Sequence, residues 1–146
     1  MTKQNEPGCV TLPCTAADQD GKALRVVRGM PIEALQQVPY FVGVSRKTTG
    51  ACGLSMQLVV IPPGENCRPH LHIGSESAIY IVSGRTSNKF GPSLSQSIEA
   101  GPGDFVYVPA NEYHQGCNLS DTDPVIAIVA RNDSDEQANI KLYSPE

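Results

Sequence analysis

Several features are scarce or missing in this chain of 146 residues, and each absence narrows what the protein can do. No apolar run approaches the length needed to span a bilayer, which argues against a membrane protein. The net charge is −4 and no basic cluster offsets it, so nucleic acid is not expected as a partner. The first seven residues lack the apolar core of a signal peptide, and we therefore expect a cytoplasmic protein.

Cysteine is informative through its odd count of five, because a secreted disulfide framework usually uses an even number. Without a secretion signal, this count predicts reduced thiols. Cys9 and Cys14 could pair or bind a metal. No second cysteine pair completes a zinc set, however, so ordinary thiols in an N-terminal arm are the favoured interpretation.

Histidine occurs only three times, and two of the three stand close together. His70 and His72 are separated by one residue, so on an extended strand both side chains leave the same face. Glu76 stays in phase with them if the strand continues, and His114 lies far along the chain. Two imidazoles and a carboxylate suit a borderline divalent metal such as Mn, Fe, Ni, Zn or Cu. The pattern therefore predicts a metal site.

Two segments with regular spacing contain all of these histidines. The first covers residues 64–84 and reads Gly64, five residues, His70, Leu71, His72, three residues, Glu76. The second covers residues 103–118 and reads Gly103, five residues, Pro109, Ala110, Asn111, two residues, His114, three residues, Asn118. In order and separation, these segments resemble the two motifs of the cupin family.

This resemblance implies an all-β fold, a double-stranded β-helix or cupin jelly-roll barrel, with one divalent metal per chain. It implies His70, His72, Glu76 and His114 as the metal ligands. Mn, Fe or Ni is favoured, with Zn as an alternative, because these three metals accept five or six ligands more readily than zinc does. We expect a single barrel domain over residues 24–146, after an N-terminal arm over residues 1–23.

The chain departs from the family pattern at two positions. Seven residues separate Glu76 from Gly84, where the family usually has six, and Ser77 occupies the six-residue spacing. A one-residue bulge would restore Glu76 to the metal; otherwise three histidines and water would hold the ion. Asn111 replaces a glycine of the family, and asparagine tolerates a positive φ better than other non-glycine residues do.

Branched residues bounded by glycine and proline turns predict the short strands typical of a barrel or sandwich. The expected strands cover residues 24–28, 54–61, 78–83, 94–99, 104–108, 125–130 and 140–143, with a loop at 88–92. A short N-terminal helix is expected over residues 31–38. Pro31 suits a first helical position, and apolar residues recur every three residues from Ile32 onward.

Cys117 follows His114 by three residues and is the sharpest catalytic candidate. Strict alternation places it on the opposite face, but a turn at 115–116 could swing it toward a metal that lowers its pKa. A buried, inert cysteine is the alternative. The chain also resembles small bacterial cupins of methylthio-sugar salvage, which remove the methylthio group from a methylthio-xylulose phosphate with glutathione as the thiol. Cys117 would match their active-site cysteine, and Cys67 is the rival thiol.

Other candidates rest on residue type and position. Tyr80 and Tyr107 are candidate catalytic residues in the pocket wall, and a phosphorylated substrate would need cations near the barrel mouth. The candidate substrate-binding residues are Arg68, Arg85, Lys89 and Gln57, and Arg131 ends the last barrel strand. Solvated surface positions are the common alternative for such cations.

Two functions of different classes follow from these observations. The first is a metal-dependent enzyme acting on a small polar metabolite. Its sharpest form is a carbon–sulfur lyase on a methylthio-sugar phosphate, and dioxygenase, isomerase or decarboxylase chemistry stays open. The second is a non-catalytic cupin that binds a metal or a small ligand. In both cases exposed strand edges favour a homodimer, formed through residues 1–30 or the terminal strand.

Overall fold

The computed structural model describes residues 24–145, so the expected N-terminal arm over residues 1–23 lies outside the described residues. Regular structure within them is almost entirely β. The strands are β1 (Met30–Ile32), β2 (Tyr40–Val44), β3 (Ser55–Ile61), β4 (His70–His72), β5 (Ser77–Ser83), β6 (Thr86–Phe90), β7 (Gln96–Ala100), β8 (Phe105–Val108), β9 (His114–Asn118), β10 (Val125–Arg131) and β11 (Ile140–Leu142). One helix, α1 (Arg46–Thr49), and one 3-10 turn (Pro92–Leu94) accompany them.

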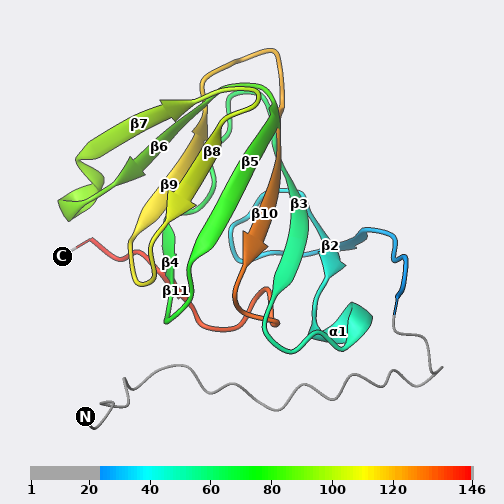
Figure 1. The fold of residues 1–146 in the computed structure, drawn as a ribbon. Coiled ribbons are helices and arrows are strands. Elements are labelled where there is room, and N and C mark those ends of the chain that lie inside the picture. The colour runs from blue at the N-terminus through cyan, green and yellow to red at the C-terminus, as the bar shows by residue number, and fades with distance from the viewer. Residues whose placement is uncertain (1–23, 146) are drawn as a thin grey trace, which may run out of the picture.

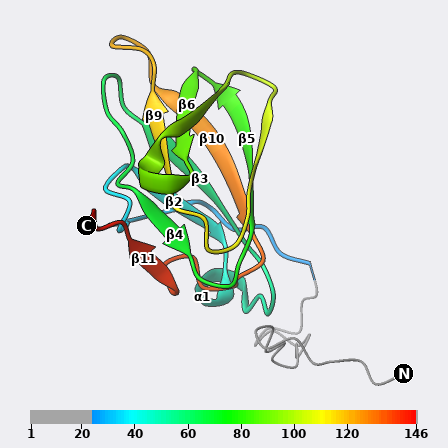
Figure 2. The same ribbon diagram turned by 90° about the vertical axis from the view of Figure 1, so that its left-hand side faces the viewer.

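The strands form two antiparallel sheets that face each other (Figures 1 and 2). The six-stranded sheet has the order β1-β2-β3-β10-β5-β8, and the five-stranded sheet has the order β11-β4-β9-β6-β7. Consecutive strands such as β5 and β6 belong to different sheets, so the chain repeatedly crosses between them. This arrangement is the double-stranded β-helix expected from the two motifs.

Alternation along the strands explains which side chains fill the interior. In β3 the buried positions are Ser55, Gln57, Val59 and Ile61, and in β10 they are Val125, Ala127, Val129 and Arg131. The apolar members of these sets form the core together with residues of β2, because a half-buried strand turns every second side chain toward its partner sheet. Polar residues occupy inward positions at one end of the same strands.

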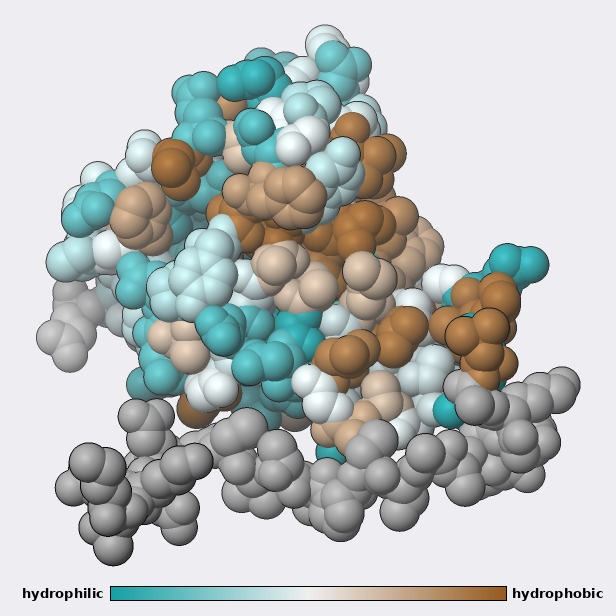
Figure 3. All heavy atoms as spheres, viewed as in Figure 1, coloured by the Kyte–Doolittle hydropathy of each residue, from teal (hydrophilic) through white to brown (hydrophobic). Residues whose placement is uncertain are grey.

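The opposite surface of the six-stranded sheet is unusually apolar. Its outward positions on β2, β3, β5, β8 and β10 are Phe41, Met56, Leu58, Val60, Ala78, Tyr80, Val82, Phe105, Tyr107, Ile126, Ile128 and Ala130. None of these residues is charged, and Figure 3 shows hydrophobic residues gathered over the middle of this side. We call these twelve positions the outer apolar face.

Gly84 marks one of the points where the chain crosses between the sheets, in the turn from β5 to β6. Its φ is +83°, and a Cβ placed there would lie 2.6 Å from the carbonyl oxygen of Pro124. Only glycine fits this backbone and this close approach. The chain therefore turns sharply at this position, and the glycine is structurally required.

The short helix is present, but not at the expected place. Residues 31–38 form part of β1 and a turn, with Pro31 paired to Phe41 and Gln37 at a φ of 60°, which a right-handed helix does not allow. The apolar side chains spaced three residues apart lie on a strand and the turn that follows it. Instead, α1 begins after the capping residue Ser45 and ends at Gly50.

Two further expectations about elements are wrong. Residues 24–28 form no strand, and residues 88–92, expected as a loop, belong largely to β6, which is paired on both sides. The remaining predicted strands occur within a few residues of their expected bounds, including β11, which pairs with β4. Among the described residues, no helix is long and apolar enough to cross a membrane.

Candidate metal centre

The three histidines meet in the interior of the barrel. His70 and His72 lie on β4 and leave the same face, and His70 is the register partner of His114 on β9. The Nε2 atoms of His70 and His72 are 3.1 Å apart, and one ring nitrogen from each histidine lies within 4.8 Å of the others. Three imidazoles at this separation can share one metal ion.

Backbone carbonyls determine which ring nitrogen carries the proton in two of these histidines. The Nδ1 atom of His70 lies 2.7 Å from the carbonyl oxygen of Arg68, and Nδ1 of His114 lies 2.9 Å from that of Glu112. Because a carbonyl oxygen only accepts, each Nδ1 carries the proton and each Nε2 presents a lone pair. This is the outer support that metal-binding histidines typically have.

His72 differs, since its Nδ1 is buried without a hydrogen-bond partner. The ring can donate from Nε2 to the Nε2 of His70. A metal that replaced this hydrogen bond would leave the proton on Nδ1. The three residues therefore fit a metal ion, with one ring less firmly oriented than the other two.

The protonation states also suit a metal. Burial lowers the pKa of His70 to about 3 and that of His72 to about 2, and it lowers the pKa of His114 as well. The nearby cation of Arg131 further lowers the pKa of each histidine. All three rings are neutral at pH 7, which is the form that binds metals.

The histidines lie at the polar end of a cavity of about 800 Å³ between the two sheets. Apolar side chains such as Val59, Ile81 and Val129 line most of its wall. Such a cavity can admit a small metabolite, which a few polar groups would orient.

Arg131 is the most unusual of those polar groups. It is 6% exposed and lines the same cavity as the histidines. Its Nε donates to Ser77 Oγ at 2.9 Å, and its Nη1 donates to the backbone carbonyl of Glu136 at 3.4 Å. Within residues 24–145 the guanidinium makes no ion pair with a carboxylate. A buried guanidinium without such a partner is costly, which points to a role in binding.

Tyr40 lies beside this guanidinium and beside Gln57, but its hydroxyl makes no well-aligned hydrogen bond within the described part of the chain. Burial raises the pKa of Tyr40, while Arg131 acts in the opposite direction. The hydroxyl therefore stays protonated at neutral pH and can donate a hydrogen bond into the cavity.

Glu76 does not join the histidines, contrary to the expectation from the motif. Its exposed side chain accepts a hydrogen bond of 2.6 Å from the hydroxyl of Tyr107 on the outside of the sheet. In β5 the inward residues are Ser77, Ile79 and Ile81, so Glu76 has the outward phase. A register shift does occur in β5, but it lies opposite residues 126–127 and leaves this phase unchanged.

Asn111 adopts the positive φ that was expected of an asparagine in place of the family's glycine. Its φ is 63°, in the left-handed region. Its backbone N–H donates to the carbonyl of His72, and its Oδ1 accepts from the N–H of Gly74 at 3.0 Å. The asparagine thus ties the second motif to the end of the first, which glycine could not do with a side chain.

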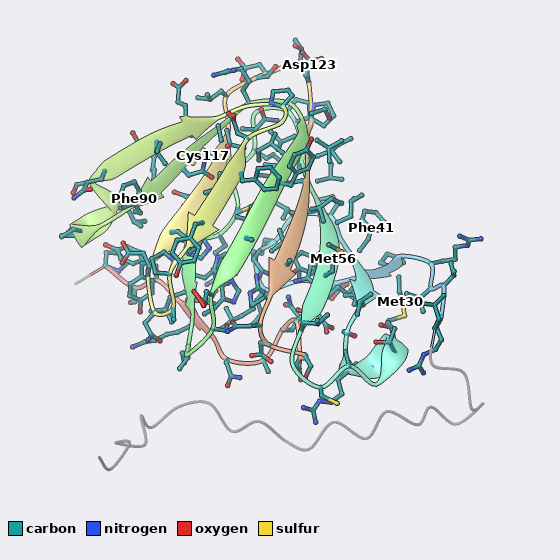
Figure 4. The ribbon with its side chains drawn as sticks, in the orientation of Figure 1. Met30, Phe41, Met56, Phe90, Cys117 and Asp123 are labelled. Carbon is teal, nitrogen blue, oxygen red and sulfur yellow. The ribbon has the colours of Figure 1, made fainter. Side chains whose placement is uncertain are left out.

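The cysteines do not support a thiolate at the metal. Cys117 is buried but does not line the cavity, as strict alternation from His114 required (Figure 4 labels it on β9). Burial raises its pKa, and burial raises that of the cavity-lining Cys67 to about 12. Both are free thiols, whereas Cys52 is disulfide-bonded, which departs from the expectation that every thiol is reduced.

The remaining sequence candidates are mostly away from the histidines. Tyr80 lies on the outer apolar face and does not line the cavity, whereas Tyr107 does line it, as expected, with its hydroxyl bonded to the carboxylate of Glu76. Arg85 pairs with Glu99 at the surface, and Arg68 is exposed. Gln57 is buried but does not line the cavity, which leaves Lys89 as the only one of the four proposed substrate-binding residues in its wall.

Sequence reasoning undervalued Arg131 and missed Ser77 and Tyr40 as parts of the site. A signal for Arg131 was available, because it continues the inward phase of Val125, Ala127 and Val129. A charged residue in phase with a buried apolar row is seldom a surface residue. Its neighbours across the cavity could not be read from the chain, since β2, β5 and β10 meet only in the folded barrel.

The fold and the histidine cluster together define a metal-binding double-stranded β-helix protein. The cupin domain model matches residues 57–138, more than half of the chain, and the chain belongs to the cupin family.

Solved structures are similar in fold. The oxalate decarboxylase of Lactobacillus farciminis shares 21% identity at a TM-score of 0.66, covering 80% of this chain and 36% of that one. An uncharacterised double-stranded β-helix protein of Klebsiella pneumoniae shares 16% identity at a TM-score of 0.61, covering 84% and 91%. The oxalate decarboxylase of Bacillus subtilis shares 20% identity at a TM-score of 0.63, covering 77% and 29%.

A curated protein is similar over a shorter stretch. Protein FAM234B of Gallus gallus is 37% identical over 70 residues, which are 48% of this chain and 11% of that protein. The chain thus spans only a small part of FAM234B and about a third of the Lactobacillus decarboxylase.

Proposed function

We propose that this chain is a metal-dependent enzyme that acts on a small, oxygen-rich, anionic metabolite. The observation that carries the proposal is the meeting of three neutral imidazoles and a buried guanidinium in one cavity. Imidazoles without a carboxylate among them would hold a divalent ion, and the guanidinium would attract an acidic ligand.

The fold neighbours are compatible with this proposal. The oxalate decarboxylase of Bacillus subtilis has Mn(II) centres, and its substrate is a small dicarboxylate. Manganese, iron or nickel stays our favoured metal here, with zinc as the alternative. This similarity shows a shared fold only, so the proposed function rests on the residues of this chain.

His70, His72 and His114 would hold the ion, and each can do so without losing a proton at pH 7. Such an ion supplies Lewis-acid chemistry, which can polarise a carbonyl, stabilise an enediolate or activate water. Arg131 would orient an acidic group, and Tyr40 can donate to an oxygen at the same end of the cavity. The apolar wall would keep solvent from the reacting group.

The geometry does not favour the carbon–sulfur lyase hypothesis. That hypothesis needs a thiolate near the metal, and Cys117 lies outside the cavity wall. Cys67 does line the cavity, but its raised pKa of about 12 keeps it protonated at neutral pH. A non-catalytic cupin that binds the same metal and ligand is the alternative to an enzyme.

Elemental analysis of protein purified without an affinity tag would test the metal site, on the wild type and on His72→Ala. We expect about one equivalent of Mn, Fe, Ni or Zn per chain in the wild type and almost none in the variant. Turnover of small carboxylic and oxo acids by the loaded protein would then separate an enzyme from a binding protein. A wild type that takes up no divalent metal would refute the proposal.

A further inference from the structure

The position that the family fills with a metal-binding glutamate faces the cavity here as a serine. Ser77 has the inward phase of β5 and the six-residue spacing to Gly84, while Glu76 points outward. The described residues provide no carboxylate ligand atom within the histidine group. Glu112 lines the cavity, but its Oε1 accepts from the backbone N–H of Gly91.

A cation stands where the glutamate's negative charge would otherwise be. The Nε of Arg131 is bonded to Ser77 Oγ, so the guanidinium adjoins the glutamate position itself. Its influence reaches all three histidine rings, whose pKa values it lowers. Glu136 is also buried, but only its backbone carbonyl contacts Arg131, and its Oε2 has no hydrogen-bond partner within the described residues.

A divalent ion on three neutral imidazoles beside this guanidinium would bring about three positive charges together, and the nearby carboxylates of Glu112 and Glu136 would offset them only in part. Like charges in such surroundings repel each other strongly. An acidic ligand would remove this repulsion by contacting the ion through one oxygen and the guanidinium through another. The guanidinium has the planar set of donors that suits a carboxylate.

We propose that the carboxylate missing from the protein is supplied by the ligand, so that metal and carboxylate bind cooperatively at the His70–His72–His114 cluster, with Arg131 and Ser77 in the place of a protein ligand. This inference rests on the proposed function. Cooperativity of this kind is reciprocal, since each partner raises the affinity for the other by the same factor.

The test is a calorimetric titration of metal-free protein with Mn²⁺, with and without sodium malonate. We expect malonate to strengthen Mn²⁺ binding to the wild type at least tenfold. Arg131→Met should bind Mn²⁺ alone more tightly than the wild type, because the repulsion is gone, and should lose the malonate effect. If Arg131→Met only damaged the fold, it would instead weaken both the binding of Mn²⁺ alone and the malonate effect.

Ser77→Glu provides the second variant, because it restores a carboxylate at the inward position. It should bind Mn²⁺ alone at least tenfold more tightly than the wild type and respond little to malonate. Glu76→Gln is the matched control, since it alters the neighbouring outward residue, and it should behave like the wild type. Because malonate chelates Mn²⁺ in solution, affinities are compared on the basis of free Mn²⁺, and this correction is the same for every variant.

The outcomes separate the two proposals. If the wild type binds no Mn²⁺ under either condition, the proposed metal-dependent function fails. If it binds Mn²⁺ equally well with and without malonate, only the cooperative site is overturned. Loss of Mn²⁺ binding in Glu76→Gln would also overturn it, by returning that carboxylate to the metal.

A separate observation concerns the outer apolar face of the six-stranded sheet. Its large side chains include Met56, Tyr80, Val82, Phe105 and Tyr107, with exposed fractions from 38% for Tyr80 to 78% for Phe105. An antiparallel sheet with one side in water usually carries polar residues on that side. Figures 3 and 4 show this side of the molecule, where Phe41 and Met56 lie on adjacent strands.

We infer that this face is covered by the same face of a second copy of the chain. The five side chains expose on the order of 500 Å² if each large side chain spans roughly 200 Å². Half-buried neighbours on β3 and β10 add to this area, which approaches the roughly 800 Å² that each partner of a standard interface buries. The twelve positions of the face carry no charge, so a two-fold pairing brings no like charges together there; the carboxylate of Glu76, bonded to Tyr107, precedes the start of β5.

Light scattering at micromolar concentration would test this pairing. The wild type should have about twice the chain mass of 15.6 kDa, and the double variant Phe105→Asp/Val82→Asp should have the mass of one chain. Leu119→Asp is the control, because Leu119 is 49% exposed directly after β9 of the other sheet and does not line the cavity, and this variant should stay dimeric. A monomeric wild type, or a double variant that stays dimeric, would overturn the inference. The second result would move the interface to the terminal segments first expected.

Discussion

The two sheets of this barrel contribute different chemistry to one cavity. The five-stranded sheet supplies every histidine of the metal site, from β4 and β9. The six-stranded sheet supplies the polar groups opposite them, Arg131 from β10, Ser77 from β5 and Tyr40 from β2. Neutral metal-binding groups thus face a cation and neutral donors across the interior.

The outward sides of the two sheets differ as well. The strands of the six-stranded sheet have an outer face without charge, while β6, β9 and β11 of the other sheet carry polar residues such as Ser87, Gln115 and Lys141. The two sheets therefore differ both in the side chains that face the cavity and in those that face outward. Under the two proposals, the five-stranded sheet would hold the metal and meet water, and the six-stranded sheet would hold an acidic ligand and be covered by a second copy.

The largest effect is expected where the chain passes from one sheet to the other at Gly84. Gly84→Ala should reduce the free energy of unfolding by about 3 kcal/mol, because its Cβ would meet Pro124 in a left-handed backbone. Gly103→Ala is the control. It has a similar φ of +89° but no atom within 4 Å of an added Cβ, and it should cost only about 1 kcal/mol. Equal losses in urea denaturation would contradict the close approach at Gly84.

Acid should destabilise the metal-free protein because the buried histidines of the five-stranded sheet take up protons only when the chain unfolds. The folded pKa of His70, about 3, lies below the unfolded value of 6.5, so below pH 6.5 the unfolded chain binds the extra proton. Between pH 6.5 and 5.5 this costs about 1 kcal/mol per buried histidine.

His70→Gln should therefore lose stability less steeply than the wild type over this range, by the contribution of one histidine. Denaturant midpoints measured at both pH values would show the difference. Parallel pH profiles would mean that His70 titrates in the folded state as an ordinary histidine does.

Asn111 lies in the crossing from β8 to β9 and offers a smaller test. Asn111→Ala should cost about 1 kcal/mol, because it combines a left-handed φ with the loss of the bond to Gly74. Asn111→Gly keeps the backbone and loses only the side-chain bond, so it should cost less. An alanine variant as stable as the glycine variant would show that the φ of 63° carries no penalty.

The smallest effect is expected at Cys117, which packs away from the cavity. Cys117→Ser should leave metal content unchanged and alter the free energy of unfolding by no more than about 1 kcal/mol. Elemental analysis and denaturation would check both. Loss of turnover in this variant, with metal retained, would revive the thiol chemistry that the geometry disfavours.

Much of the fold could be predicted because each signal was local. Turns with glycine and proline bounded strands rich in branched residues. The two motifs predicted the histidine site and the positive φ of Asn111. The helix expected over 31–38 failed because eight residues with a spacing of three fit a strand and a turn equally well. Pairing of Pro31 with Phe41 decided between them.

By itself, the sequence determined that three histidines would meet, since His70 and His72 share a face in any extended strand and the second motif brings His114 beside them. The tertiary structure alone decided the fate of Glu76, because the phase of β5 is set by its pairing with β8 and β10 rather than by the motif. It also decided that Arg131 faces the histidines. A guanidinium can be placed opposite a metal site only by two sheets closing on each other, and contacts across that gap leave no pattern along the chain.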